Sequence, residues 1–175
     1  MDIQQIIKLF LPLPPEQRAA LMSESLFGFD ALVGMRFSHV ADDRVSASLV
    51  VTDRHVQPYG LVHGGVYATL GESTCSVGVA MAVMASGDNA VGVENTTRFH
   101  RGARPGTTLQ IEARPLSEQG SYRTWQAIIT SGEGTRHATS RVTVAVLAPG
   151  TRIAGEDVGL VGGLDVESKI RGSDG

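Results

Sequence analysis

The carboxylate of Glu72 stands in unusual surroundings. It is the one charged residue between His63 and Asp88, in a stretch built from apolar and small residues. Burying an ionised carboxylate without partners is costly, so such a group is paired, protonated or functional. The functional interpretation is a carboxylate held at a cleft and available for acid/base or nucleophilic work. The simpler alternative places Glu72 on the exposed face of a helix that is less buried than its composition indicates.

A second chemical feature, His63-Gly64-Gly65, begins the same stretch. Two glycines let a ligand approach the backbone closely, and a helix N-terminus offers unpaired N–H groups that can stabilise a developing oxyanion. The plainer alternative is a tight turn into the helix, with His63 as its cap. The tripeptide alone is a weak motif, but its combination with an isolated glutamate at this spacing is much more specific.

The spacing of these two features constrains how they act together. Gly64 and Glu72 are eight residues apart, so one helix separates them by about 12 Å along its axis. A glutamate side chain cannot bridge that gap to a carbonyl held at the helix N-terminus. If both groups act on one atom, they come from different subunits with antiparallel helices, which predicts a dimer with two composite sites.

The elements that must position these residues follow from the pattern of apolar residues. Residues 2–11 and 15–26 are predicted as short amphipathic helices separated by prolines. Alternation of apolar and polar residues over 44–52 predicts a strand, the second of two after Met35, and residues 64–87 predict one long buried helix. Four further strands are expected at 90–99, 107–116, 122–131 and 137–147.

This order predicts an α+β fold in which an antiparallel sheet wraps one long central helix. We expect the four later strands to form a meander, since turn residues separate each from the next. Three regions are expected: a helical extension at 1–33, the main domain at 34–148, and a flexible Gly-rich tail at 149–175.

Composition excludes several classes of function. A net charge of −3 and few aromatic residues argue against nucleic-acid binding. The single cysteine, Cys75, is expected to be a small buried hydrophobe rather than a nucleophile. The five histidines lack paired spacing, so no metal site is predicted.

No membrane association is predicted either. The N-terminus has an early acid, one lysine and no cleavage site, unlike a secretory signal. Residues 64–87 are long enough to span a bilayer, but they contain Glu72 and many small residues, which fits a helix buried between protein layers. A cytoplasmic location is expected.

Three stretches carry a resemblance to a known family. They read QPYGLVHGGVYATLGE over 57–72, VGVENTT over 91–97 and RGARPGT over 101–107. Together they resemble the hotdog-fold acyl-CoA thioesterases, in the branch holding 4-hydroxybenzoyl-CoA and phenylacetate-pathway thioesterases. The resemblance covers roughly residues 35–147 and implies the hotdog fold, in agreement with the element order.

The resemblance also implies roles for individual residues. The Gly64 N–H would polarise the thioester carbonyl, and Gln57 and His63 would shape that end of the site. Glu72 would attack the carbonyl as a nucleophile or activate water, and both possibilities stay open. Ser76 lies four residues on, on the same helical face, where a hydroxyl would orient the attacking group; the alternative is an inert small residue.

Coenzyme A enters as part of the substrate, and no separate cofactor is implied. Its phosphates would be bound by cationic and hydroxyl groups, for which the candidates are Arg101, Arg104, Ser121 and Arg123. The family implies a homo-oligomer, either a dimer or a tetramer formed as a dimer of dimers. The acyl group is not revealed.

Other functions remain open alternatives. A hotdog dehydratase or hydratase would use an Asp/His pair in a different context, which is not seen. A non-catalytic acyl-CoA-binding or regulatory domain would keep the fold but would not need a buried carboxylate. A thioesterase acting on acyl carrier protein is a further possibility. Glu72 together with Ser76 favours an enzyme.

Overall fold

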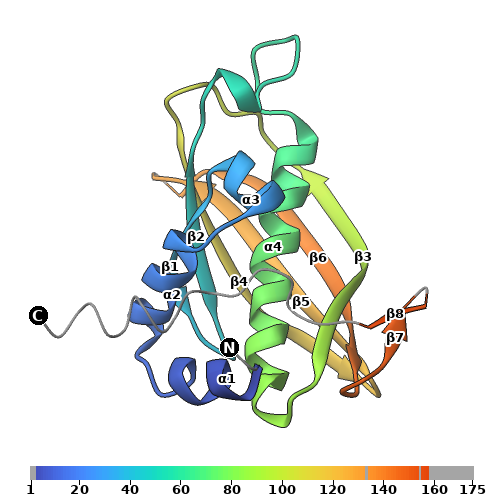
Figure 1. Ribbon diagram of the computed structural model, residues 1–175. Helices are drawn as coiled ribbons and strands as arrows, with labels where there is room; N and C mark the ends of the chain where they lie inside the picture. Colours follow the sequence, from blue (N-terminus) through green and yellow to red (C-terminus); the bar gives the residue numbers. More distant parts are fainter. Residues whose placement is uncertain (1–2, 133, 154, 158–175) are drawn as a thin grey trace, which may run out of the picture.

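The computed structural model describes residues 3–132, 134–153 and 155–157, which form an α+β fold (Figure 1). Its helices are α1 Ile3–Phe10, α2 Pro15–Glu24, α3 Gly28–Val33 and α4 Gly64–Val83, with short 3-10 helices at Asp53–His55 and Met84–Ser86. Its strands are β1 Arg36–Val40, β2 Val45–Val50, β3 Asn89–Phe99, β4 Thr108–Gln119, β5 Tyr122–Ser131, β6 Arg136–Leu147, β7 Arg152–Ile153 and β8 Glu156–Asp157.

The predicted helices and the six predicted strands are confirmed, whereas α3, the short strands β7 and β8 and the two 3-10 helices were not predicted. Helix α3 has six residues, too few to show a helical period in the sequence. It ends at Gly34, whose φ of 76° is the left-handed conformation typical of a glycine after a helix.

The prediction that the last four strands form a meander is wrong for β3. The six strands lie in the order β1-β2-β4-β5-β6-β3, with neighbouring strands antiparallel. Only β4, β5 and β6 form a meander, because β3 enters at the far edge of the sheet and pairs with β6. The sheet between β2 and β3 curves around α4 (Figure 1). As a result, β3 has one unpaired edge among the described residues.

Helix α4 lies directly on the sheet because two of its glycines carry no side chain. A Cβ at Gly71 would meet Ser140 Oγ at 2.1 Å, and a Cβ at Gly78 would meet the Trp125 ring at 2.1 Å. These glycines are seven residues apart and therefore share one face of the helix. The close approach buries the apolar faces of both layers in one core.

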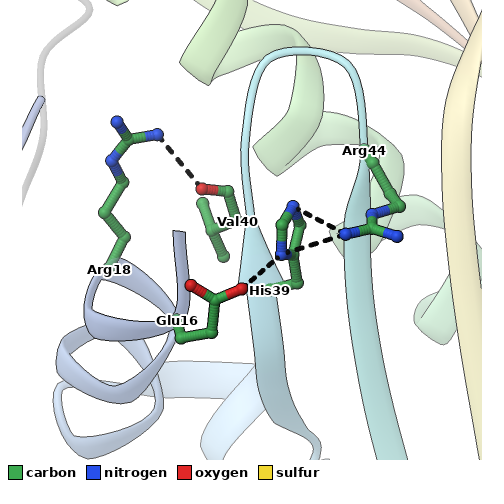
Figure 2. Close-up of polar contacts among 5 residues, drawn as sticks. All are labelled: Glu16, Arg18, His39, Val40 and Arg44. Carbon is green, nitrogen blue, oxygen red and sulfur yellow. Dashed lines mark hydrogen bonds and ion pairs between the residues drawn. The ribbon is translucent and has the colours of Figure 1, made fainter. Parts of the chain in front are cut away.

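The N-terminal extension is bound to the β1 side of the sheet. Arg18 on α2 donates to the carbonyl of Val40 at 3.2 Å, and the Glu16 carboxylate lies 3.0 Å from Nδ1 of His39 (Figure 2). Arg44, the residue before β2, donates to the same imidazole at 3.3 Å. Phe10 is fully buried, so this extension contributes side chains to the core.

Two expectations concern α4 and the C-terminal tail. Within the described residues, one helix, Gly64–Ser86, is long and apolar enough to cross a membrane, and it packs against strands β2 to β6. In the predicted tail, β7 and β8 pair as a two-stranded sheet. Residue 154 and residues 158–175 lie outside the described part of the chain, so flexibility of the tail stays a prediction.

Candidate active site

A cavity of about 370 Å³ opens at the N-terminus of α4. Its walls include Gly64, Gln57 and Leu61 from one side and Phe99 and Arg101 from the other. Gly64 is the first residue of the helix, and its N–H has no hydrogen-bond partner among the residues described. An unpaired donor at a helix N-terminus is suited to bind a carbonyl oxygen or an oxyanion.

Glycine at position 64 keeps this donor accessible. A Cβ there would lie 2.9 Å from the Phe99 ring. The tilted ring pair of Phe99 and Tyr67, with centroids 6.2 Å apart, forms the adjoining wall. The Tyr67 hydroxyl donates to the carbonyl of Arg101 at 3.2 Å, so it holds the end of β3 against the helix.

His63 is the N-cap of α4. Its Nδ1 accepts the N–H of Gly65 at 2.9 Å, as the plainer interpretation of the tripeptide expected. The imidazole is exposed and does not belong to the lining of the cavity. This geometry gives His63 a structural part as the cap at the N-terminal end of the helix.

Glu72 lies in the middle of α4, half-buried and facing β3. Its Oε2 accepts from Asn95 Nδ2 at 3.0 Å, and its Oε1 lies 3.5 Å from the Ser76 hydroxyl. The structure therefore brings Glu72 and Ser76 together, although over a long hydrogen bond. The alternative of a glutamate on an exposed helix face does not hold.

Asn95 is held by a chain of hydrogen bonds that crosses three elements. Its Nδ2 also donates to the carbonyl of Ala68 at 3.0 Å, and its Oδ1 accepts from Thr97 at 2.7 Å. The Thr97 hydroxyl in turn lies 2.9 Å from that of Ser140 on β6. Since the amide oxygen accepts and the amide nitrogen donates, the side chain has one orientation. The carboxylate of Glu72 is thereby positioned by the sheet.

Gly92 completes the surroundings of the carboxylate. A Cβ at this position would lie 2.2 Å from Glu72 Oε1, so the oxygen occupies space that any side chain would fill. Asn95 and Gly92 were not predicted as site residues, although both lie in the stretch 91–97 that carried the resemblance. A glycine inside a strand indicates close approach of another group, which was the available signal.

These groups form two separate clusters on one chain. Gly64 is the first residue of α4 and Gln57 lies beside it, whereas Glu72 lies about 12 Å further along the helix and Ser76 one turn beyond Glu72. Glu72 is not among the residues that line the cavity at Gly64. One chain therefore does not bring the Glu72 carboxylate to the Gly64 N–H.

The residues predicted to bind coenzyme A are also divided. Arg101 lines the cavity at Gly64, and Arg104 is exposed in the following loop. Ser121 and Arg123 lie at the β4–β5 turn, at the opposite end of the sheet. Arg123 forms an ion pair with Glu118 at 3.4 Å. One chain does not bring the four residues together.

The Cys75 thiol is unsuited to nucleophilic chemistry. The side chain is fully buried, and burial followed by the nearby charge of Glu72 raises its pKa well above the usual value. The thiol therefore stays protonated, and a thiolate is the form that attacks. In the part of the chain that the structure describes, no group of three or more His, Cys, Asp or Glu side chains could hold a metal ion.

Comparisons with known proteins agree with this architecture. Residues 59–138 match the family model of the thioesterase superfamily. The chain is 31% identical over 135 residues to the 1,4-dihydroxy-2-naphthoyl-CoA hydrolase of Escherichia coli, which covers 75% of this chain and 98% of that protein. It is 30% identical over 115 residues to the proofreading thioesterase EntH of Cronobacter turicensis, covering 66% of this chain and 82% of that protein.

A solved thioesterase structure from Haemophilus influenzae shares the fold. The TM-score is 0.67 at 26% identity, over 78% of this chain and 92% of that one. Fold, motif and sequence relatives agree over the region that holds Gly64 and Glu72. The chain belongs to the thioesterase superfamily and is a hotdog-fold thioesterase, a hydrolase of thioesters.

Proposed function

We propose that the protein hydrolyses an acyl-CoA thioester to the free acid and coenzyme A. The Gly64 N–H donates a hydrogen bond to the oxygen of the thioester carbonyl. Glu72 either attacks the carbonyl carbon or removes a proton from water that attacks it. Coenzyme A is part of the substrate, and its phosphates meet Arg101 and Arg104. The E. coli relative, by its name, acts on a naphthoyl-CoA, which supports a CoA thioester and an aryl acyl group like those of the 4-hydroxybenzoyl-CoA and phenylacetate-pathway branch.

One observation carries the mechanism: Glu72 is a half-buried carboxylate held by Asn95 with one oxygen left beside Gly92. Glu72 Oε2 is occupied by the amide, while Oε1 has only the long contact to Ser76. A carboxylate oxygen accepts more than one hydrogen bond, so Oε1 keeps capacity for water or for attack.

The proposed mechanism requires a second subunit, because one chain keeps Gly64 and Glu72 apart. Strand β3 lies at the edge of the sheet with Val93 and Phe99 exposed at 55% and 57%. An open edge with apolar residues is a template for pairing with another strand. Antiparallel pairing of two β3 strands would run two α4 helices in opposite directions and set Glu72 of each opposite Gly64 of the other. Ser121 and Arg123 of a second subunit would then approach the same CoA.

Hydrolysis of an acyl-CoA panel tests the proposal. Benzoyl-, hydroxybenzoyl-, phenylacetyl- and fatty acyl-CoA substrates would be followed with a thiol-detecting reagent, with Glu72→Ala and Glu72→Gln in parallel. Turnover should nearly vanish in both variants while their circular dichroism stays native. Unchanged turnover in Glu72→Gln, which keeps the shape of the side chain, would refute the role of the carboxylate.

The oxyanion donor can be tested with a matched pair of variants. Gly64→Pro removes the N–H at the first helical position, where proline fits, and His63 has a ψ of 137° that suits a residue before proline. Gly64→Ala adds the same Cβ near Phe99 but keeps the N–H. We expect kcat to fall about 10²–10³-fold further in the proline variant than in the alanine variant. Equal values for the two would argue against an N–H at this position as the donor.

Mixed oligomers test the shared site. Inactive Glu72→Ala and Gly64→Pro proteins, once their subunits exchange, should regain part of the activity, because one of the two composite sites in a mixed dimer carries neither change. No recovery despite measured exchange would contradict the geometry. If wild type binds acyl-CoA without hydrolysing any member, a binding domain or an acyl-carrier-protein substrate becomes the better explanation.

A further inference from the structure

A β-bulge in β3 lies directly beside the Glu72 carboxylate. The register of β3 against β6 shifts between Gly92 and Glu94, which leaves Val93 as one extra residue. In a regular strand Gly92 and Asn95 would point to opposite faces, because they are three residues apart. The bulge turns both toward α4, where Gly92 lies against the Glu72 carboxylate and Asn95 donates to it. Two residues of one strand thus reach the same carboxylate.

The hydrogen bonds behind Asn95 run in one direction. Its amide gives both hydrogens away, to the carbonyl of Ala68 and to Glu72, at 3.0 Å each. The Thr97 hydroxyl donates its one hydrogen to Asn95 Oδ1 at 2.7 Å. Thr97 has no second hydrogen, so in its 2.9 Å contact with Ser140 it accepts and Ser140 donates. The donors therefore run from Ser140 through Thr97 to Asn95 and end at the carboxylate.

This chain of hydrogen bonds begins in the core and ends at the surface. Ser140 lies opposite Thr97 in the register of β6 and β3, and it is fully buried against Gly71 of α4. A buried hydroxyl needs a hydrogen-bond partner, which fixes the Ser140 end. Hydrogen bonds aligned in one direction polarise and strengthen one another. The buried hydroxyls thereby support the bond from Asn95, whose side chain is exposed at the edge of the sheet.

We propose that Thr97 is a positioning residue for Glu72, an inference that rests on the proposed function. Its hydroxyl holds the Asn95 amide with both N–H groups toward α4. Without that hydroxyl, Asn95 Oδ1 loses its donor, and the amide can rotate about its broad terminal torsion. Glu72 then loses its fixed position relative to the carbonyl carbon. Binding of the substrate at Gly64 is unaffected, so the loss falls on kcat.

Three variants of nearly the same shape test this role. Thr97→Val replaces the hydroxyl by a methyl group, whereas Thr97→Ser keeps the hydroxyl. Thr96→Val is the matched control, because Thr96 lies on the opposite face of β3 and its hydroxyl contacts Glu94. With the preferred acyl-CoA, Thr97→Val should lower kcat about tenfold with KM unchanged. Thr97→Ser should retain most of kcat, and Thr96→Val should match wild type.

A double-mutant cycle shows whether Thr97 acts through Asn95. In an Asn95→Ala background, Thr97→Val should have almost no further effect on kcat, because the group that Thr97 positions is gone. Additive losses would overturn the inference, since Thr97 would then act independently of Asn95. Unchanged kcat in Thr97→Val would also overturn it, and so would an equal loss in Thr97→Ser.

An NMR measurement decides the inference without turnover. The chain has two asparagines, Asn89 and Asn95, so ¹⁵N-labelled asparagine gives two side-chain amide signals, and Asn95→Ala identifies one of them. Solvent exchange of the Asn95 amide protons should be about tenfold faster in Thr97→Val than in wild type and unchanged in Thr96→Val. Equal rates in Thr97→Val and wild type would overturn the inference. If these rates differ as expected but wild type hydrolyses no acyl-CoA, the proposed function fails and the contact from Thr97 to Asn95 stands.

Discussion

Substitution of Gly92 by alanine should displace the Glu72 carboxylate while leaving the stability of the fold unchanged. The new Cβ would lie 2.2 Å from Glu72 Oε1, whereas ordinary contact begins at about 3.4 Å. The carboxylate must therefore move by about 1 Å. It can do so because it is the end of a flexible side chain, and the nearest other atom, Cδ of the same residue, is already at 3.4 Å.

We expect this displacement to lower kcat rather than the stability of the protein. Displacement of a reacting group by about 1 Å can reduce the rate about 100-fold, and the hydrogen bond to Asn95 is strained by the same movement. The fold should tolerate the change, since Gly92 has no left-handed φ and a glycine-to-alanine change at a compatible position stabilises by about 0.4–1 kcal/mol. We expect kcat to fall about 100-fold with an unchanged or slightly raised Tm.

Kinetics with the preferred acyl-CoA and thermal unfolding by circular dichroism measure the two effects. Gly132→Ala is the matched control, because a Cβ at Gly132 meets nothing within 4 Å. That variant should retain full activity. Near-normal kcat in Gly92→Ala would refute the placement of the carboxylate against β3, and a large loss of Tm would show that Gly92 serves packing instead.

Three further substitutions have distinct expected outcomes. Gly78→Ala forces a methyl group to within 2.1 Å of the Trp125 ring in the core, so urea denaturation should show a loss of about 1–3 kcal/mol; an unchanged midpoint would contradict the close approach of α4 to β5. Asn95→Ala removes the donor to the Glu72 carboxylate and should lower kcat about 10–100-fold with little change in KM, whereas a rise in KM with kcat unchanged would assign Asn95 to substrate binding. Burial raises the pKa of Tyr67 to about 12 from its usual 10.0, so the folded state holds this proton more tightly than the unfolded chain. Its contribution to stability is complete below pH 10 and is lost as the pH rises toward 12, so the unfolding free energy of wild type should fall more steeply across that window than that of Tyr67→Phe. The exposed Tyr59→Phe is the control, and parallel curves for wild type and Tyr67→Phe would contradict burial of the phenol.

Much of the fold was predictable because local patterns are strong in this chain. The alternation over 44–52 and the apolar run over 64–87 predicted β2 and α4 from side-chain periodicity alone. The pairing of strands within the sheet was not predictable in the same way. Consecutive strands with turns between them suggested a meander, yet β3 pairs with β6, because the chain leaves α4 at the far edge of the sheet. Sequence spacing carries no information about which edge a strand joins.

The same division holds for the candidate site. Isolation of Glu72 in an apolar run, and its eight-residue distance from Gly64, were enough to predict a carboxylate and an oxyanion donor that one helix keeps apart. The hydrogen bond from Asn95 to Glu72 and the space that Gly92 leaves for the carboxylate depend on strand register. Residue type and spacing along one helix are properties of the sequence, but contacts between α4, β3 and β6 exist only after the sheet has curved around the helix. Local chemistry is therefore determined by the sequence itself, and its partners are decided by the tertiary structure.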